Sequence, residues 1–161
     1  MQYYVNNQVE TVGEMNYGKT EGQVLWFWEN GQIKDLSFFV DDLEQGEHIS
    51  YHRNGQLKVK YNVINNFREG RSVEYYENGT IKRTIEIKKG SIVDGELTTY
   101  WDNGNFLFIE NYFNGKIHGE RKIFVNDGAL EKTQLYENGI LTWDSQEEDD
   151  RELFDFINNS I

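Results

Sequence analysis

A unit of about 24 residues recurs along most of the chain, and this repetition limits the possible folds more than any other feature. A turn glycine closes each copy, at intervals of 24, 24, 25 and 24 residues. These turn glycines are Gly31, Gly55, Gly79, Gly104 and Gly128. A second glycine column keeps the same rhythm at Gly22, Gly46, Gly70, Gly95 and Gly119. A fixed period in the range of 20–50 residues indicates an array of stacked units.

Each unit is predicted to contain two β-strands joined by a hairpin. The dipeptide Asn-Gly occurs at 30–31, 54–55, 78–79 and 103–104. It favours a type I′ turn, which needs positive φ at both central residues. A short aromatic segment such as SVEYY precedes the turn, and a β-branched segment such as TIKRTIEIK follows it. Neither has the 3.6-residue period of a helix, so the sequence predicts an all-β array of about six units over residues 1–143.

Alternation along the strands divides the repeat columns between two faces, because neighbouring side chains point to opposite sides of a sheet. Two columns are aromatic or aliphatic in every copy, and we expect them to form the core. They are Tyr3, Phe27, Tyr51, Tyr75, Tyr100 and Phe124, with Val9, Ile33, Leu57, Ile81, Phe106 and Leu130.

A ladder of large side chains is expected on the opposite face. It comprises Tyr4, Trp28, His52, Tyr76, Trp101 and Val125. These side chains could pack on one another, since a cross-strand pair contributes about 0.2–1 kcal/mol. Alternatively, the exposed ladder could contact a partner. The candidate partner-binding residues are Trp26, Trp28, His52, Tyr76 and Trp101.

The charge is strongly acidic overall but unevenly distributed. The chain of 161 residues has a formal net charge of −12. Residues 53–89 nevertheless hold nine Lys or Arg against four Asp or Glu, a net of +5. The acidic total argues against a general nucleic-acid binder, which needs a basic surface. A solvated strand face is the simpler explanation of the basic belt, and a binding role is the alternative.

Several protein classes are disfavoured by what the sequence lacks. There is no cysteine for a disulfide framework or thiol chemistry. No apolar stretch approaches the ~18 residues of a membrane span, and no secretory leader is recognisable at Met1. We therefore expect a cytoplasmic protein.

The tail, residues 144–161, departs from the repeat pattern. Ser145 and Glu148 have the spacing of a helix capping box, and acidic residues at 147–150 favour a helix start. Leu153, Phe154 and Ile157 form an apolar stripe. We expect an acidic helix that caps the last unit, because an open sheet edge invites aggregation. A docking segment for another protein is the alternative.

Catalytic and metal-binding patterns are not recognisable. The chain has three histidines, and His48 and His52 lie about 13 Å apart on an extended strand, too far to share a metal. It has no phosphate-binding loop, zinc-protease motif or nucleophile elbow. The sequence therefore predicts no enzyme activity, no cofactor and no metal site.

The repeat resembles the variant MORN repeat of bacterial proteins. The pattern is clearest in GRSVEYYENGTIK at 70–82 and NYFNGKIHGE at 111–120, and the resemblance covers residues 3–143. It implies an elongated, single-layer antiparallel meander of hairpins. Bacterial proteins of this type are often described as antitoxins or immunity-like proteins, which are taken to bind a protein.

Together, these observations predict a non-catalytic protein-binding module. Its specific form would be an antitoxin or immunity-type inhibitor whose acidic ends steer it toward a basic toxin. The alternative is a scaffold that joins several partners, possibly at a membrane surface. An anionic membrane would attract a basic surface, whereas this chain is acidic overall.

Overall fold

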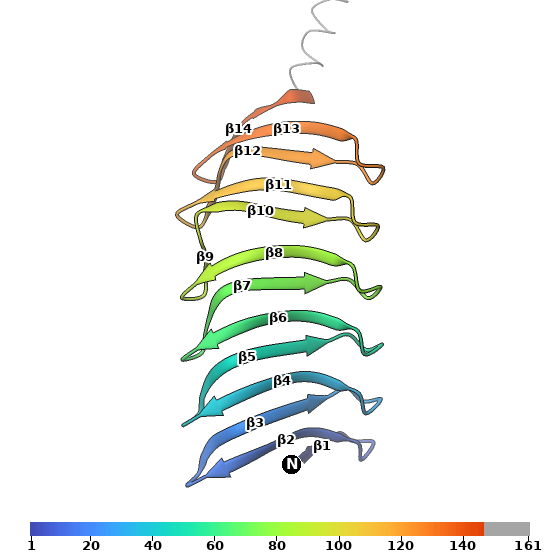
Figure 1. Ribbon diagram of the computed structural model, residues 1–161, viewed down its shortest axis with the longest axis vertical. Coiled ribbons are helices and arrows are strands. Elements are labelled where there is room, and N and C mark those ends of the chain that lie inside the picture. Colours follow the sequence, from blue (N-terminus) through green and yellow to red (C-terminus); the bar gives the residue numbers. More distant parts are fainter. Residues whose placement is uncertain (147–161) are drawn as a thin grey trace, which may run out of the picture. The chain divides into compact units, whose positions relative to one another are not determined.

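The computed structural model describes residues 1–146, and these residues form two compact all-β units (Figure 1). The first unit extends from Met1 to Ile92 and the second begins at Val93. In each unit, successive strands pair antiparallel in sequence order. The predicted all-β antiparallel meander is therefore confirmed. The predicted capping helix over 144–161 lies almost wholly outside the described residues.

The strands of the first unit form one sheet in the order β1 to β8, with β9 paired to β8. Their bounds are β1 Gln2–Tyr3, β2 Val9–Asn16, β3 Lys19–Phe27, β4 Ile33–Val40, β5 Leu43–Tyr51, β6 Leu57–Ile64, β7 Phe67–Tyr75, β8 Ile81–Lys88 and β9 Ser91–Ile92. The second unit contains β10 Gly95–Tyr100, β11 Phe106–Phe113, β12 Lys116–Phe124, β13 Leu130–Glu137 and β14 Ile140–Asp144.

The Asn-Gly turns differ from the predicted type I′ geometry. Gly31 has a φ of +82°, but Asn30 is not among the residues with positive φ. The Gly31 N–H donates to the Trp28 carbonyl at 2.8 Å, and the Trp28 N–H donates to the Gln32 carbonyl at 2.7 Å. This pattern is a type I turn followed by a left-handed glycine, which makes a longer hairpin loop.

The two-residue turns with paired positive φ occur at the other ends of the strands. Asp41 and Asp42 have φ of 52° and 68°, and Asn65 and Asn66 have φ of 49° and 67°. Asp and Asn tolerate this region because their short polar side chains bond locally. The Asn66 Oδ1 accepts from the Glu44 N–H at 2.7 Å and so joins one hairpin to the next.

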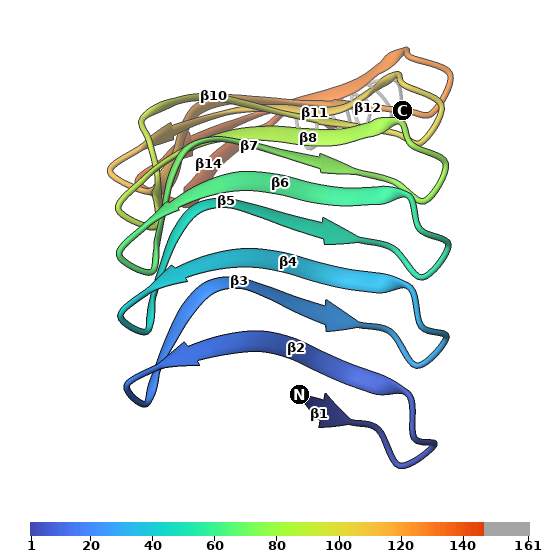
Figure 2. The ribbon, with the colours of Figure 1, turned by 60° about the horizontal axis from the view of Figure 1, so that its bottom comes forward.

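The buried residues of the first unit do not come from the two columns that the sequence assigned to the core. Each of those twelve side chains is half-buried or exposed, so that assignment is wrong. The strands are bowed (Figure 2), and the buried side chains of this unit lie on the inner side of the bow. We call this side the concave face. Its buried members are Val24, Ser37, Ser50, Tyr61, Val63, Ser72, Ile85 and Ile87.

A β-bulge after each Asn-Gly turn places the later residues of the strand on the concave face, opposite the predicted core columns. Tyr51 pairs with Leu57 and Ser50 pairs with Val59, which leaves Lys58 as an extra residue. Such an extra residue changes the side to which the following side chains point. Lys34 and Lys82 are the extra residues of the neighbouring hairpins.

The two faces of β8 should respond differently to truncation. Ile85 is 8% exposed on the concave face, whereas Ile81 is 42% exposed on the opposite face. We expect Ile85→Ala to lower the free energy of unfolding by about 2–4 kcal/mol and Ile81→Ala by about 1 kcal/mol or less. Urea denaturation of both variants measures this, and equal losses would contradict the assignment of the faces.

Candidate functional site

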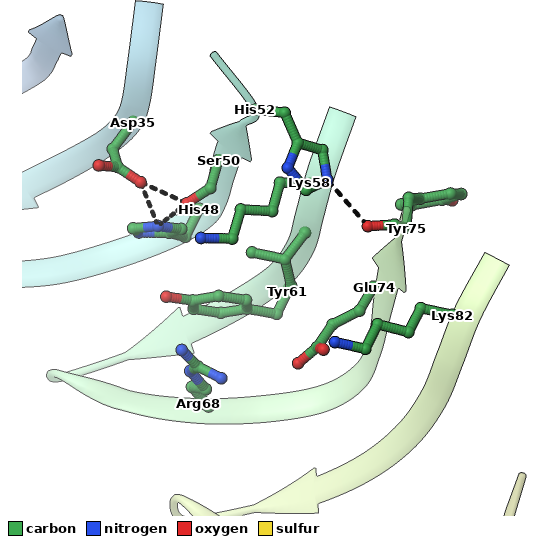
Figure 3. Close-up of a pocket in the computed structure, with 11 residues that line it drawn as sticks. Asp35, His48, Ser50, His52, Lys58, Tyr61, Arg68, Glu74, Tyr75 and Lys82 are labelled. Carbon is green, nitrogen blue, oxygen red and sulfur yellow. Dashed lines mark hydrogen bonds and ion pairs between the residues drawn. The ribbon is translucent and has the colours of Figure 1, made fainter. Parts of the chain in front are cut away.

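A groove hollows the concave face of the first unit across β4 to β8 (Figure 3). Its volume is about 370 Å³, which lies within the usual range for ligand sites. Five consecutive strands or the turns beside them supply its walls. The lining residues are Asp35, His48, Ser50, His52, Lys58, Val59, Tyr61, Arg68, Glu74, Tyr75 and Lys82.

A chain of polar contacts forms one wall of this groove. His48 Nδ1 lies 2.7 Å from Glu44 Oε1, and His48 Nε2 lies 3.1 Å from Ser50 Oγ. The Ser50 hydroxyl donates in turn to Asp35 Oδ1. Ser37 Oγ donates to Glu44 Oε1 at 2.5 Å. Because each polar atom has a partner, this half-buried cluster avoids the cost of unpaired polar groups.

The two carboxylates favour the charged form of His48. Burial alone would lower the pKa of His48, but its contacts with Asp35 and Glu44 outweigh burial and raise the pKa above 6.5. Burial would raise the pKa of Asp35, but its contacts with His48 and Ser50 lower the pKa below 3.8. The two shifts have opposite signs because each group stabilises the charge of the other.

Ser50, His48 and Glu44 resemble the order of a catalytic triad, but their hydrogen bonds do not match that chemistry. In a triad, neutral histidine accepts the serine proton. Here the Ser50 hydroxyl donates its single proton to Asp35 Oδ1, so it has none to give to His48. Ser50 is also a buried residue near the end of β5. The geometry therefore favours a structural cluster.

The floor of the groove is a stack of three planar groups. The rings of His48 and Tyr61 are stacked with centroids 4.5 Å apart and planes at 8°. The Arg68 guanidinium lies 4.0 Å from the Tyr61 ring centroid. Such cation–π contacts restrain the guanidinium but do not neutralise its positive charge. Arg68 is consequently held in place beneath the groove.

The cations of the groove differ from its carboxylates in forming no ion pair in the described part of the chain, although Asp35 and Glu74 line the same groove. Lys58, Arg68 and Lys82 form no ion pair within residues 1–146. By contrast, Glu74 pairs with Arg83 at 2.7 Å, and Asp35 is held by His48 and Ser50. The free charge available to a ligand here is therefore positive.

The predicted aromatic ladder has a structural function that the sequence did not reveal. The indole N–H of Trp28 donates to the Tyr51 carbonyl at 3.2 Å, and His52 Nε2 contacts the Tyr75 carbonyl at 2.9 Å. In the second unit, the Trp101 indole N–H donates to the Phe124 carbonyl at 3.0 Å. Each bond links one hairpin to the strand 23 residues further on. These bonds do not test whether the ladder contacts a partner, so that contact stays a prediction.

The five candidate residues do not form a single site. Of the five, His52 alone lines the groove. Trp26 lies beside it, in a shallow hollow shared with Asp35, His48 and Phe39. Trp28 and Tyr76 lie beneath the ammonium groups of Lys34 and Lys82, at 5.1 and 5.7 Å from the ring centroids.

Sequence reasoning missed most residues that line the groove. The repeated Lys34, Lys58 and Lys82 column was visible, but only the β-bulge directs Lys58 and Lys82 into the groove. His48 and Arg68 occupy positions without a repeated residue type, so no column identified them. The net charge of +5 over residues 53–89 was the one available signal.

Comparison with known families identifies the repeats of the first unit. Residues 20–41, 44–65 and 68–89 match the MORN repeat variant. Every residue that lines the groove falls within these three segments. MORN repeats are generally modules that bind proteins or membranes. The prediction of variant MORN repeats is confirmed for these segments, and the groove is built from three consecutive copies.

Other comparisons add little to this result. A search of curated proteins gave no match. Among solved structures, the chain is similar to part of the GtfA/B complex bound to UDP and GlcNAc, with 13% identity and a TM-score of 0.30. The match covers 76% of this chain and 23% of that one. Such a weak likeness carries no functional argument.

Two classes of feature are absent from the part of the chain that the structure describes. Within residues 1–146 there is no cluster of three or more His, Asp or Glu side chains suited to hold a metal ion. The same range contains no helix that is long and apolar enough to span a bilayer.

The histidine cluster makes stability depend on pH. Because folding raises the pKa of His48, its contribution is fully present below about pH 6.5 and is lost as pH rises through the folded-state pKa. We expect NMR titration of the His48 ring to give a midpoint above 6.5, and Asp35→Asn to lower it. A wild-type midpoint below 6.5 would show that burial, and not the carboxylates, controls this residue.

Proposed function

We propose that the protein is a non-catalytic module that binds another protein through the concave face of its first unit. The observation that supports this proposal most directly is the groove across β4 to β8, built from three consecutive MORN-variant repeats. The His48, Tyr61 and Arg68 stack and the His52 ring are held by neighbouring strands before any ligand arrives. Such preorganisation reduces the entropy lost on binding.

The more specific form of this proposal is an antitoxin or immunity-type inhibitor. A preformed sheet face could cover the active site of a toxin without any chemistry of its own. The net charge of −12 would speed encounter with a basic protein, while the groove itself would meet an acidic part of it. The support for this form is the charge distribution and the resemblance of the repeats.

The proposed binding face can be tested by photo-crosslinking in a lysate of the source cell. Lys58 and Lys60 lie on the same strand, but Lys58 lines the groove and Lys60 pairs with Glu47 on the opposite face. A benzophenone amino acid would replace Lys58 in one sample and Lys60 in a matched control. We expect one discrete protein adduct from position 58, identified by mass spectrometry, and none from position 60.

Equal labelling from both positions, or no adduct from position 58, would contradict binding through the concave face. The substitutions should leave the fold intact because both lysine side chains are exposed.

The inhibitor form makes a separate prediction about the partner. The crosslinked protein, expressed alone, should arrest growth of its host, and co-expression of this chain should restore it. Growth curves with and without co-expression measure the effect. A crosslinked partner that is harmless when expressed alone would contradict the toxin hypothesis but leave the binding module intact.

A further inference from the structure

The chemistry of the groove indicates which part of a partner it would recognise. Three cations and two carboxylates line it directly, Lys58, Arg68 and Lys82 against Asp35 and Glu74. The formal charge of these five side chains is +1, or +2 if the His48 ring is also charged, whereas the whole chain has a net charge of −12. An anionic ligand is therefore attracted by the groove and repelled by the acidic remainder of the protein.

The second unit provides an internal comparison. Its sheet also carries cations, and three of them form ion pairs within the unit. Arg121 Nε lies 3.1 Å from Glu110, Lys122 Nζ lies 3.3 Å from Glu120, and Lys132 Nζ lies 2.9 Å from Asp144. Glu110 occupies the repeat position of Tyr61, six residues after the turn glycine. At that repeat position the second unit thus supplies a carboxylate for a nearby cation, whereas the groove has the Tyr61 ring there.

The positions of the lysines favour several carboxylates over a single anion. Lys58 belongs to β6 and Lys82 to β8, with β7 between them. Two strand spacings amount to about 10 Å, which exceeds the reach of one carboxylate or phosphate group. Figure 3 shows both ammonium groups directed into the groove and Arg68 on its floor. Anions on different residues of one segment would satisfy them.

We propose that the groove binds an extended, acidic segment of the protein partner, whose carboxylates pair with Lys58, Lys82 and Arg68. This inference rests on the proposed protein-binding function and specifies the chemistry of that same site. The His52 ring and the Val59 side chain offer the stems of the acidic side chains a partly apolar wall. Each ion pair replaces water around one exposed cation and sets the register of the segment.

A membrane and a nucleic acid suit the groove less well. A bilayer surface is flat, so headgroups that approach the concave face would meet the ends of the bowed strands before they reached the groove between them. Both ligands are also polyanions that extend beyond the groove and would be repelled by the acidic remainder of the chain.

The probe is an acetylated heptapeptide that alternates glutamate with glycine, titrated into the ¹⁵N-labelled protein at low salt. A heptapeptide that alternates glutamine with glycine is its neutral control. We expect the glutamate peptide to shift the amide resonances around Lys58, Arg68 and Lys82. The glutamine peptide should leave them unchanged. Adding salt should weaken binding, because exposed ion pairs are screened.

Matched variants test which side chains carry the binding. We expect the double variant Lys58→Gln/Lys82→Gln to bind the glutamate peptide at least about fivefold more weakly, because two exposed ion pairs are lost. Lys60→Gln, on the opposite face of β6, should change the affinity less than about twofold by the same reasoning. The amide spectra of all three proteins verify their folding. An unchanged affinity in the double variant would overturn the proposal.

Three further probes identify the source of the anion. Inorganic phosphate, a thymidine decamer and vesicles of phosphatidylglycerol and phosphatidylcholine are titrated under the same conditions. Phosphate that displaces the peptide at equal concentration would indicate a general anion site and overturn the proposal. Vesicle or oligonucleotide binding that is stronger than peptide binding and is lost in the double variant would also overturn it.

The peptide titration and the crosslinking experiment can fail independently. A discrete adduct from position 58 without peptide binding would preserve the protein-binding function and refute the acidic segment. Peptide binding without any adduct would support the chemistry of the groove and count against a protein partner in the source cell.

Discussion

Within residues 1–146 no second layer covers the sheet of the first unit, which must therefore obtain its burial from its own side chains. The strands are bowed (Figure 2), and bowing brings side chains on the concave face closer together than those on the other face. Val63 and Ser37 are 2% and 1% exposed there. The resulting core is thin, and much of it is polar. Stability therefore depends on hydrogen bonds and ion pairs as well as on apolar burial.

Bonds between consecutive hairpins connect this thin core into an array. Trp28 and His52 each reach a backbone carbonyl 23 residues further on. Asn30 and Asn54 do the same from the turns, with their amides donating to the carbonyls of Arg53 and Glu77. Each hairpin is thus stabilised mainly by its neighbour, as in other repeat proteins. The same bonds hold the walls of the groove rigid.

The period, the strands and the antiparallel order could be predicted from the sequence, because glycine and asparagine mark every turn. The buried face could not, since alternation gives two faces without saying which is buried. The β-bulge at Lys58 then reverses the parity of the residues that follow it. As a result, Leu57 and Tyr61 lie on opposite faces although four positions separate them. The groove depends on that reversal and on the non-repeated residues His48 and Arg68, so its lining was not predictable from the columns.

The balance of paired and unpaired charges separates the structural from the functional part of this surface. Asp35, Glu44 and Glu74 all have cationic or hydroxyl partners, so their desolvation is compensated. Lys58 and Lys82 are exposed and form no ion pair within residues 1–146, and the contact of Lys82 with the Tyr76 ring is a weak one, so both add little to stability. Placing them in a groove also brings like charges together, which is unfavourable without an anion. A binding function for the groove explains this arrangement, because an acidic ligand would turn that repulsion into attraction.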